Sequence, residues 1–251
     1  MTQRRAPRLH VAAGFAAGGD LELAAGQGHY LSTVLRLGPG APVAVFNSAA
    51  GEWLCRIAAT GRNGVRLIVD HQLRPAESED ELDLWLLFAP IKRGRLDWLV
   101  EKATELGVSA LLPVWTAHTQ VERLNLDRLR AHAIEAAEQS ERLSVPELRP
   151  PERLERILAG WPARRRLIMC DESGNGEPIA AAAAHLTPGP TALLIGPEGG
   201  FDQTELDGVR KLSFVTRVGL GPRVLRAETA AIAAVAVFQA IAGDGRRIRT
   251  R

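Results

Sequence analysis

The sequence is poor in cysteine and lysine. Its two cysteines, Cys55 and Cys170, lie far apart and outside any CxxC motif, which excludes a zinc ribbon and a thioredoxin-type site. Unpaired thiols are typical of reducing compartments, so we expect a cytoplasmic protein. Lysine occurs only at positions 92, 102 and 211, so the basic charge is almost all arginine. We attribute this excess to a composition bias that also enriches alanine and glycine.

Export signals and membrane spans are also missing. The basic start of the chain is followed by no apolar segment of the kind that a secretory signal requires. The longest apolar stretch, Ala227–Gly243, is interrupted by Glu228, Thr229 and Gln239, and it is too short and too rich in alanine for a good membrane span. We therefore expect a soluble protein with no membrane partner.

Common cofactor and metal motifs are absent as well. The chain has no GxGxxG fingerprint, and no glycine precedes a lysine, which excludes a Walker A loop. It has no HExxH motif, and its six histidines are scattered, so we expect no metal site.

The first 73 residues are predicted to be mostly β-structure. One helix is expected at His29–Leu37, because Gly38, Pro39 and Gly40 form a clear stop signal. Several short strands with glycine-rich turns indicate a small barrel, in which the third and fourth strands form a hairpin. The polar, acidic stretch 74–81 is the expected linker to a second domain. The predicted strands are Arg8–Ala12, Asp20–Ala24, Pro42–Asn47, Glu52–Ala58 and Val65–Asp70.

From residue 82 onward, apolar strands alternate with amphipathic helices. This alternation predicts an α/β fold with a mostly parallel sheet, in which ligands bind beyond the carboxyl ends of the strands. The predicted strands are Leu82–Ala89, Ala110–Trp115, Arg166–Cys170, Thr191–Ile195 and Val215–Leu220. The predicted helices are a segment around Leu96–Leu106, and Leu126–Leu143, Pro178–Leu186, Gln203–Leu212 and Ala227–Ala242.

Two segments, Leu193–Phe201 and Val218–Ala230, each run from a strand through a glycine-rich loop into a helix. Glycines permit positive φ angles and a close approach of the backbone to a ligand. From their spacing alone, ligand loops and plain structural turns explain these segments equally well.

The letters of these segments carry more information than their spacing. LLIGPEGGF at 193–201 and LGPRVLRAETAA at 220–231 resemble the signature of the RsmE family of 16S rRNA uridine-N3 methyltransferases, in the SPOUT superfamily. The segments KRGRLDWLVEKATELGV at 92–108, AIEAAEQSERLSVPEL at 133–148 and HYLSTVLRLGPG at 29–40 are similar to the same family. The resemblance therefore covers nearly the whole chain.

The resemblance implies a PUA-like, RNA-binding β-barrel at 1–73 and a SPOUT methyltransferase domain at 82–251 with a deep trefoil knot, a topology that is rare among proteins. It implies a homodimer that transfers a methyl group from S-adenosylmethionine to uridine N3 in 16S rRNA, within the small ribosomal subunit. A SPOUT methyltransferase of another RNA and a non-catalytic RNA-binding assembly factor are the alternatives.

The resemblance also implies a cofactor site in the knot loops. For Leu194 core packing is the favoured explanation, and Thr229 is explained equally well by a helix cap. The assignment of Asp171, after the strand at 166–170, rests on its position alone. The residues expected to contact the cofactor are Leu194, Ile195, Gly196, Pro197, Gly199, Leu220, Gly221, Val224, Leu225, Thr229 and Asp171.

Methylation of uridine N3 requires the loss of a proton, because N3 is protonated at neutral pH. Arg223 and Arg226 are candidates to neutralise the charge that develops on the base. Glu198 and Glu228 are candidate proton acceptors. Glu228 is explained equally well as a helix N-terminal charge, and the base stays unassigned.

Because N3 lies on the Watson–Crick edge of uridine, the target base must be unpaired or extruded from its helix. The enzyme therefore needs additional contacts with the RNA. Arginine and lysine side chains commonly contact phosphates, although isolated charges often form a solvated surface. The expected RNA-binding residues are Arg4, Arg8, Arg36, Lys92, Arg93, Arg95 and Arg142, with weak binding by the basic tail 246–251. The apolar helix at 227–242 is expected to be buried, within the monomer or against a partner.

Overall fold

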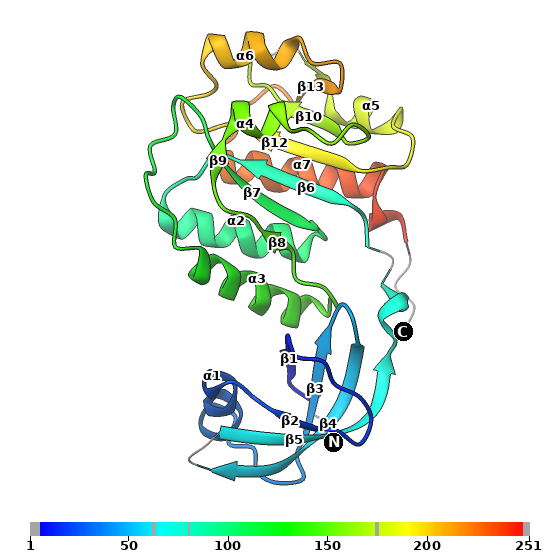
Figure 1. Cartoon of the computed structure of the whole chain (residues 1–251). Coiled ribbons are helices and arrows are strands. Elements are labelled where there is room, and N and C mark those ends of the chain that lie inside the picture. The colour runs from blue at the N-terminus through cyan, green and yellow to red at the C-terminus, as the bar shows by residue number, and fades with distance from the viewer. Residues whose placement is uncertain (1–5, 62–63, 80, 174–175, 248–251) are drawn as a thin grey trace. The chain divides into compact units, whose positions relative to one another are not determined.

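A computed structural model describes residues 6–61, 64–79, 81–173 and 176–247 (Figure 1). The chain forms two compact units, Met1–Asp80 with Ala137–Val145, and Glu81–Ala136 with Pro146–Arg251. The segment 137–145, which we expected in the second domain, therefore groups with the first. The expected linker also begins too early, because Arg74 is the last residue of a β-strand. A short 3-10 turn, η2 (Ala76–Ser78), follows that strand.

The first unit is built on a five-stranded sheet with the order β1-β3-β4-β5-β2. The predicted hairpin of β3 and β4 is confirmed by their antiparallel pairing, and β1 pairs with β3 in parallel. The apolar residues that alternate along these strands form one core, which includes Val43, Val45 and Leu67. The strands are β1 (Arg8–His10), β2 (Asp20–Glu22), β3 (Pro42–Asn47), β4 (Gly51–Gly61) and β5 (Gly64–Arg74).

The helix of the first unit begins earlier than predicted. It consists of α1 (Ala25–His29) and a π-helical turn, η1 (Tyr30–Val34). Glycine is a poor helix former, so the sequence disfavoured a helix through Gly26 and Gly28. Tertiary packing overrides that preference, because a Cβ atom on Gly28 would lie 3.2 Å from the backbone nitrogen of Val65. The glycine thus lets the helix approach β5 closely.

Arg8 is a structural residue of the first unit. Its side chain is 12% exposed, it pairs with Glu52, and its guanidinium lies 4.1 Å from the ring centre of Phe46. It also donates hydrogen bonds of 2.8–3.1 Å to the carbonyl oxygens of Ala137, Glu138 and Arg142, at the end of α3 (Leu126–Ser140). The prediction that Arg8 binds RNA is therefore wrong, because its donors are already used inside the protein.

Arg142 is likewise buried, with 7% of its surface exposed, and its guanidinium donates to the hydroxyl of Ser144 at 3.0 Å. A buried guanidinium cannot reach a phosphate on an RNA surface. Its expected RNA contact is therefore also wrong, and its local role is to order the chain after α3.

The second unit contains a parallel sheet with the order β11-β13-β10-β12-β6-β7-β8, and β9 pairs with β7. Every pairing in this sheet is parallel, as predicted from the alternating pattern. The strands are β6 (Leu84–Phe88), β7 (Ala110–Trp115), β8 (Glu147–Leu148), β9 (Glu152–Arg153), β10 (Arg166–Cys170), β11 (Glu177–Pro178), β12 (Thr191–Ile195) and β13 (Val215–Gly219).

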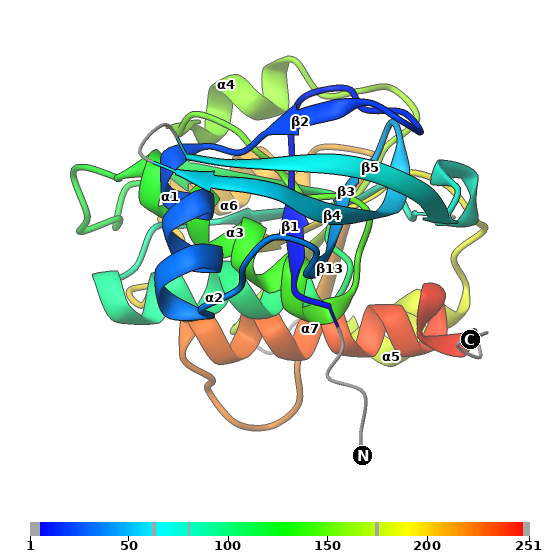
Figure 2. The ribbon, with the colours of Figure 1, turned by 90° about the horizontal axis from the view of Figure 1, so that it is seen from below.

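Helices cover both faces of this sheet (Figure 1). Apolar side chains of α4 and α6 pack on one face, whereas α7 contacts α2, α5 and β12 on the other (Figure 2). None of the helices in the described residues is long and apolar enough to cross a membrane. The helices are α2 (Arg93–Glu105), α4 (Leu154–Ala159), α5 (Ile179–Ala184), α6 (Gln203–Arg210) and α7 (Ala227–Ile241). The short elements β8, β9, α4 and β11 were not predicted.

The strand order determines where the loops meet. Because β10 lies between β12 and β13 and all three are parallel, the loops after Cys170, Ile195 and Gly219 leave the same edge of the sheet side by side. This is the edge at which α/β proteins bind ligands. The trefoil knot that the resemblance implies stays a prediction.

Candidate functional site

A cavity of about 390 Å³ lies at the carboxyl edge of the sheet in the second unit. It is lined by 170–172 after β10, by 195–198 after β12 and by 219–225 after β13, together with Ala227 and Ala230 of α7. The two glycine-rich segments singled out in the sequence therefore meet at one site.

Eight of the residues expected to contact the cofactor line this cavity: Asp171, Ile195, Gly196, Pro197, Leu220, Gly221, Val224 and Leu225. Leu194 does not, because it points into the core that underlies α4 and α6. Gly199 lines a neighbouring small hollow instead. Thr229 is exposed and makes no cap, since the residue that caps α7 is Arg226, without a side-chain hydrogen bond. The expectation for the Leu194 side chain is therefore corrected, whereas the cofactor contacts of Gly199 and Thr229 stay predictions.

The glycines of the two loops have different structural reasons. Gly221 has a φ of 102°, which residues with side chains rarely adopt. A Cβ atom on Gly196 would lie 2.7 Å from the ring of Phe201, so this glycine makes room for the phenylalanine of its own loop. The absence of a side chain at Gly196 thus allows Phe201 to pack inside the loop, and Gly196 also forms part of the cavity wall.

Asp171 places a buried carboxylate at the cavity. Its side chain is 3% exposed, and Oδ1 accepts a hydrogen bond from the backbone nitrogen of Ser173 at 2.9 Å. Oδ2 accepts no hydrogen bond and lies 3.5 Å from Nε of Arg217. Beside it, burial raises the pKa of the Cys170 thiol to about 12, so this group lines the cavity as a neutral thiol.

Sequence reasoning missed Glu172, which also lines the cavity. A Cβ atom built on Gly200 would lie 2.1 Å from Oε1 of Glu172, so this carboxylate occupies the space directly above Gly200. Burial, and then the charge of Asp171, raise the pKa of Glu172 above that of an ordinary glutamate. The available signal was its position next to Asp171, in the loop that the resemblance had already placed near the cofactor.

Arg95 connects two acidic residues of the site. Its Nη1 lies 3.1 Å from Oε1 of Glu198, and its Nε lies 3.4 Å from Oε1 of Glu228. The arginine therefore ties the loop after β12 to the first turn of α7. We had expected Arg95 to bind phosphate and Glu198 to accept a proton. Both expectations are weakened, because these two charges already neutralise each other.

The two candidate catalytic arginines differ in position. Arg223 is exposed and lines the cavity, whereas Arg226 is exposed at the start of α7 and lies outside the cavity lining. Glu228 lies in the first turn of α7, where a negative charge complements the helix dipole. This position favours the structural interpretation of Glu228.

His118, in the loop after β7, is a second residue that sequence reasoning missed. Its Nδ1 lies 3.1 Å from the carbonyl oxygens of both Gly199 and Gly200. Because carbonyl oxygens only accept hydrogen bonds, Nδ1 must carry the proton. Its neighbour Ala117 donates its backbone N–H to Glu205 at 2.8 Å, a residue of the capping box of α6. The loop after β7 thus braces the glycine-rich loop after β12.

Replacing His118 with alanine is expected to weaken binding of the cofactor that the resemblance implies about fivefold, because the glycine-rich loop loses a hydrogen bond worth about 1 kcal/mol. His118→Asn retains an N–H donor and should bind close to the wild-type level. Isothermal calorimetry with S-adenosylmethionine measures both variants. His185→Ala, at an exposed histidine after α5, is the control. If the alanine and asparagine variants bind the cofactor with equal affinity, the hydrogen bond from position 118 does not contribute to binding.

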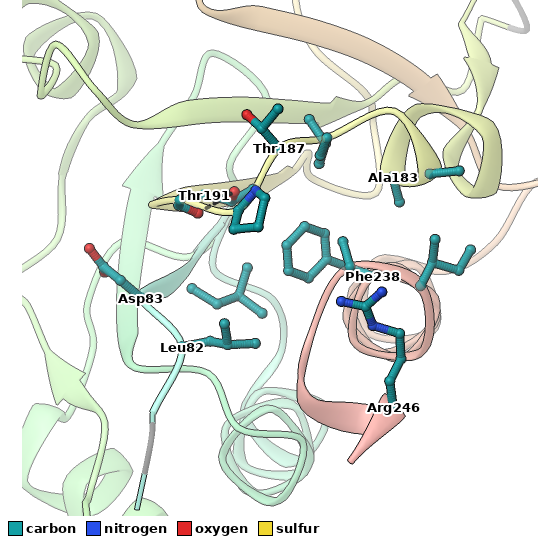
Figure 3. Close-up of a pocket in the computed structure, with 14 residues that line it drawn as sticks. Leu82, Asp83, Ala183, Thr187, Thr191, Phe238 and Arg246 are labelled. Carbon is teal, nitrogen blue, oxygen red and sulfur yellow. Dashed lines mark hydrogen bonds between the residues drawn. The ribbon is translucent and has the colours of Figure 1, made fainter.

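A separate cavity of about 210 Å³ lies at the other edge of the sheet, where β6 and β12 begin (Figure 3). Phe238 of α7, Leu82 and Ala183 of α5 line it, with Arg246 beside them. Ligands of open α/β sheets bind at the carboxyl edge, so this hollow does not match the position of a cofactor site.

Three of the expected RNA contacts, Arg36, Lys92 and Arg93, are exposed. Arg36 has a φ of 55°, which is uncommon for a residue with a side chain and is often associated with function. Tyr30, in the π-helical turn before it, is 41% exposed. Arg4 and residues 248–251 of the basic tail lie outside the described residues.

The fold and the cavity define a class of protein: an α/β domain with a small-molecule-sized cavity between the loops after β10, β12 and β13, preceded by a small β-domain. A family model described as an RNA methyltransferase domain matches residues 78–239, and an RNA methyltransferase PUA domain matches residues 23–70. The chain belongs to the ribosomal RNA small subunit methyltransferase E family. This confirms the family that the sequence motifs indicated.

Relatives of this chain are similar over most of their length. The ribosomal RNA small subunit methyltransferase E of Rickettsia conorii is 32% identical over 91% of this chain and 93% of its own length. The Neisseria gonorrhoeae member, solved with S-adenosyl methionine bound, has a TM-score of 0.85 and 26% identity, covering 96% of this chain and 99% of its own. A methyltransferase from Legionella pneumophila in complex with the same cofactor has a TM-score of 0.82 and 29% identity, covering 94% and 98%.

Proposed function

We propose that this protein transfers a methyl group from S-adenosylmethionine to N3 of a uridine in small-subunit ribosomal RNA. The observation that carries the proposal is the meeting of both glycine-rich signature loops at one cavity. Similar proteins named as small-subunit rRNA methyltransferases, and solved with this cofactor bound, support it. We also infer that it acts in the cytoplasm, where ribosomal RNA is made.

The residues at the cavity fit the cofactor. The volume of about 390 Å³ lies within the range of roughly 300–1,000 Å³ that is usual for small-molecule sites. Ile195, Leu220 and Leu225 offer an apolar slot for the adenine. Asp171 offers a buried carboxylate to the polar donors of the ribose or of the amino-acid part. A knotted arrangement of these loops, as the resemblance implies, is part of the proposal.

When bound, the cofactor supplies an electrophilic methyl group. The protein must then hold the uridine in line with that group at short range, which removes most of the entropic barrier to reaction. Loss of the N3 proton leaves negative charge on the carbonyl oxygens of the uracil ring. Arg223, which lines the cavity, and Arg226, at the start of α7, carry positive charges that can stabilise this negative charge.

A methylation assay with labelled S-adenosylmethionine tests the function. Purified protein is incubated with naked 16S rRNA or with isolated small subunits, and the nucleosides are analysed by mass spectrometry. Formation of 3-methyluridine is the expected result. Label in a ribose or in another base would assign a different target. If the protein binds no cofactor and labels neither form of the RNA, a non-catalytic assembly factor would be favoured.

RNA contacts form part of the same proposal. The target base must leave its stack for N3 to react, so the enzyme needs contacts with flanking phosphates. The exposed Arg36, Lys92 and Arg93 supply positive charge for them. Tyr30 adds an exposed ring on which an unpaired base can stack.

We further propose a homodimer, as the family resemblance implies. The exposed side of α7 is apolar: Thr229, Ala236 and Ala240 are exposed, and Ile232 and Ala233 are partly exposed. These positions are spaced at i, i+3, i+4, i+7 and i+11, so they share one face of the helix. Small residues allow another helix to approach closely, which suits the same face of a second copy.

Substituting Ala236 by glutamate is expected to convert a dimer into a monomer, because it places a charge in an apolar interface. Sedimentation velocity measures the mass directly. Ala131→Glu, at an exposed alanine of α3, is the matched control and should leave the mass unchanged. A wild-type protein that sediments as a monomer at all concentrations would exclude the dimer.

A further inference from the structure

We propose that Glu172 is the general base that removes the N3 proton of the uridine. This assignment rests on the proposed methyl transfer and deepens it, since the sequence left the base unassigned. In this step, the N3 proton passes to a carboxylate oxygen of Glu172. The nitrogen electron pair forms the new N–C bond to the methyl carbon, and the pair of the broken S–C bond stays on sulfur.

The charges around the cavity distinguish Glu172 from its rivals. Three carboxylates line the cavity: Asp171, Glu172 and Glu198. Asp171 is paired with Arg217 at 3.5 Å, and Glu198 is paired with Arg95 at 3.1 Å. Protonating either of these two would break an ion pair.

Glu172 has no such pair. Among the described residues, no arginine, lysine or histidine lies within ion-pairing distance of its carboxylate, although Arg223 lines the same cavity. The charge that raises its pKa is the like charge of Asp171, which is itself paired with Arg217 at 3.5 Å. Protonation of Glu172 therefore relieves a repulsion and costs no ion pair. That is the behaviour of an effective proton acceptor.

The position of Glu172 also suits a base. Its carboxylate lies next to Gly200, in the loop whose carbonyl oxygens accept hydrogen bonds from His118. A Cβ atom on Gly200 would displace this carboxylate, and the φ of 69° at this position itself favours glycine. Glu172 is exposed to solvent, and its carboxylate lies beside the loop after β12, at the rim of the cavity that both loops line.

The raised pKa of Glu172, caused first by burial and then by Asp171, has a kinetic consequence. The base must be ionised, so the rate of the wild-type enzyme should fall as the pH drops through this pKa, at a higher pH than an ordinary glutamate would give. Above it, the rate should reach a plateau.

The test compares the pH profiles of kcat for the wild type and for Glu172→Gln, on RNA that the wild type converts to 3-methyluridine. We expect about a 100-fold lower kcat at neutral pH, the usual contribution of a general base. The rate of the variant should keep rising with pH, because solvent hydroxide then removes the proton. Glu172→Asp, which keeps a carboxylate, should recover part of the rate and the acid limb. Glu177→Gln, at an exposed glutamate of β11, is the control.

The outcomes are separable. Absence of 3-methyluridine with the wild type would refute the proposed function itself. With an active wild type, a Glu172→Gln variant that loses cofactor affinity in calorimetry and keeps the wild-type pH profile would overturn the assignment. A change of pH profile in Glu198→Gln instead of Glu172→Gln would overturn it in favour of Glu198.

Discussion

Replacing Arg8 with methionine is expected to lower the free energy of unfolding by about 3 kcal/mol, because it removes one partner of a buried charge cluster. Glu52, whose side chain is 9% exposed, keeps only its pair with Arg74 at 2.7 Å. The carbonyl oxygens of Glu138 and Arg142 lose the hydrogen bond from Arg8, whereas that of Ala137 still accepts one from the backbone nitrogen of Arg142 at 3.2 Å. Urea unfolding followed by circular dichroism measures the effect.

Arg56→Met is the matched control for this prediction. Arg56 makes an exposed ion pair with Asp70 in the same unit, at 3.5 Å with side chains 56% and 41% exposed. Exposed pairs contribute less than about 1 kcal/mol. Similar losses in the two variants would contradict the structural role of Arg8. Unchanged stability of Arg8→Met together with weaker RNA binding would restore the original prediction that it contacts RNA.

Arg226→Ala is expected to lower kcat about 100-fold, the usual effect of removing one donor to a developing oxyanion. Its guanidinium lies outside the cavity lining, so the affinity for S-adenosylmethionine should not change. Single-turnover kinetics with isolated small subunits and calorimetry with the cofactor separate the two effects.

Arg223→Ala provides the contrast, because Arg223 lines the cavity. We expect it to raise the KM for the cofactor in addition to lowering kcat. A loss of cofactor affinity in Arg226→Ala as well would show that both arginines hold the cofactor. Full activity of Arg226→Ala would remove this residue from the catalytic machinery.

Some of the structure was predictable because its causes are local. The strands Pro42–Asn47, Ala110–Trp115, Arg166–Cys170 and Thr191–Ile195 have the bounds predicted for them. Each is a short apolar segment bounded by turn-forming or polar residues, so its ends are readable without its neighbours. The alternation of strands with amphipathic helices likewise predicted the parallel sheet, since each helix must cover an apolar face.

The candidate site was predictable in part. The loops that line the cavity carry family motifs, and eight residues in them were named beforehand. Leu194 was misassigned because inward and outward residues of a fully buried strand look alike in sequence. Glu172 and His118 were missed because neither belongs to a motif.

The sequence by itself determined the family, the parallel sheet and the loops that carry the signature. Only the tertiary structure decided which charged side chains are buried or paired with other residues of the protein. Arg8 and Arg142 are buried, and Arg95 pairs with Glu198 across 103 positions of the chain. The physical reason is that the state of a charged side chain depends on partners that folding brings together from distant segments. Glu172 is distinguished as a base for the same reason, because its neighbours Asp171 and Glu198 have cations within reach and it has none among the described residues.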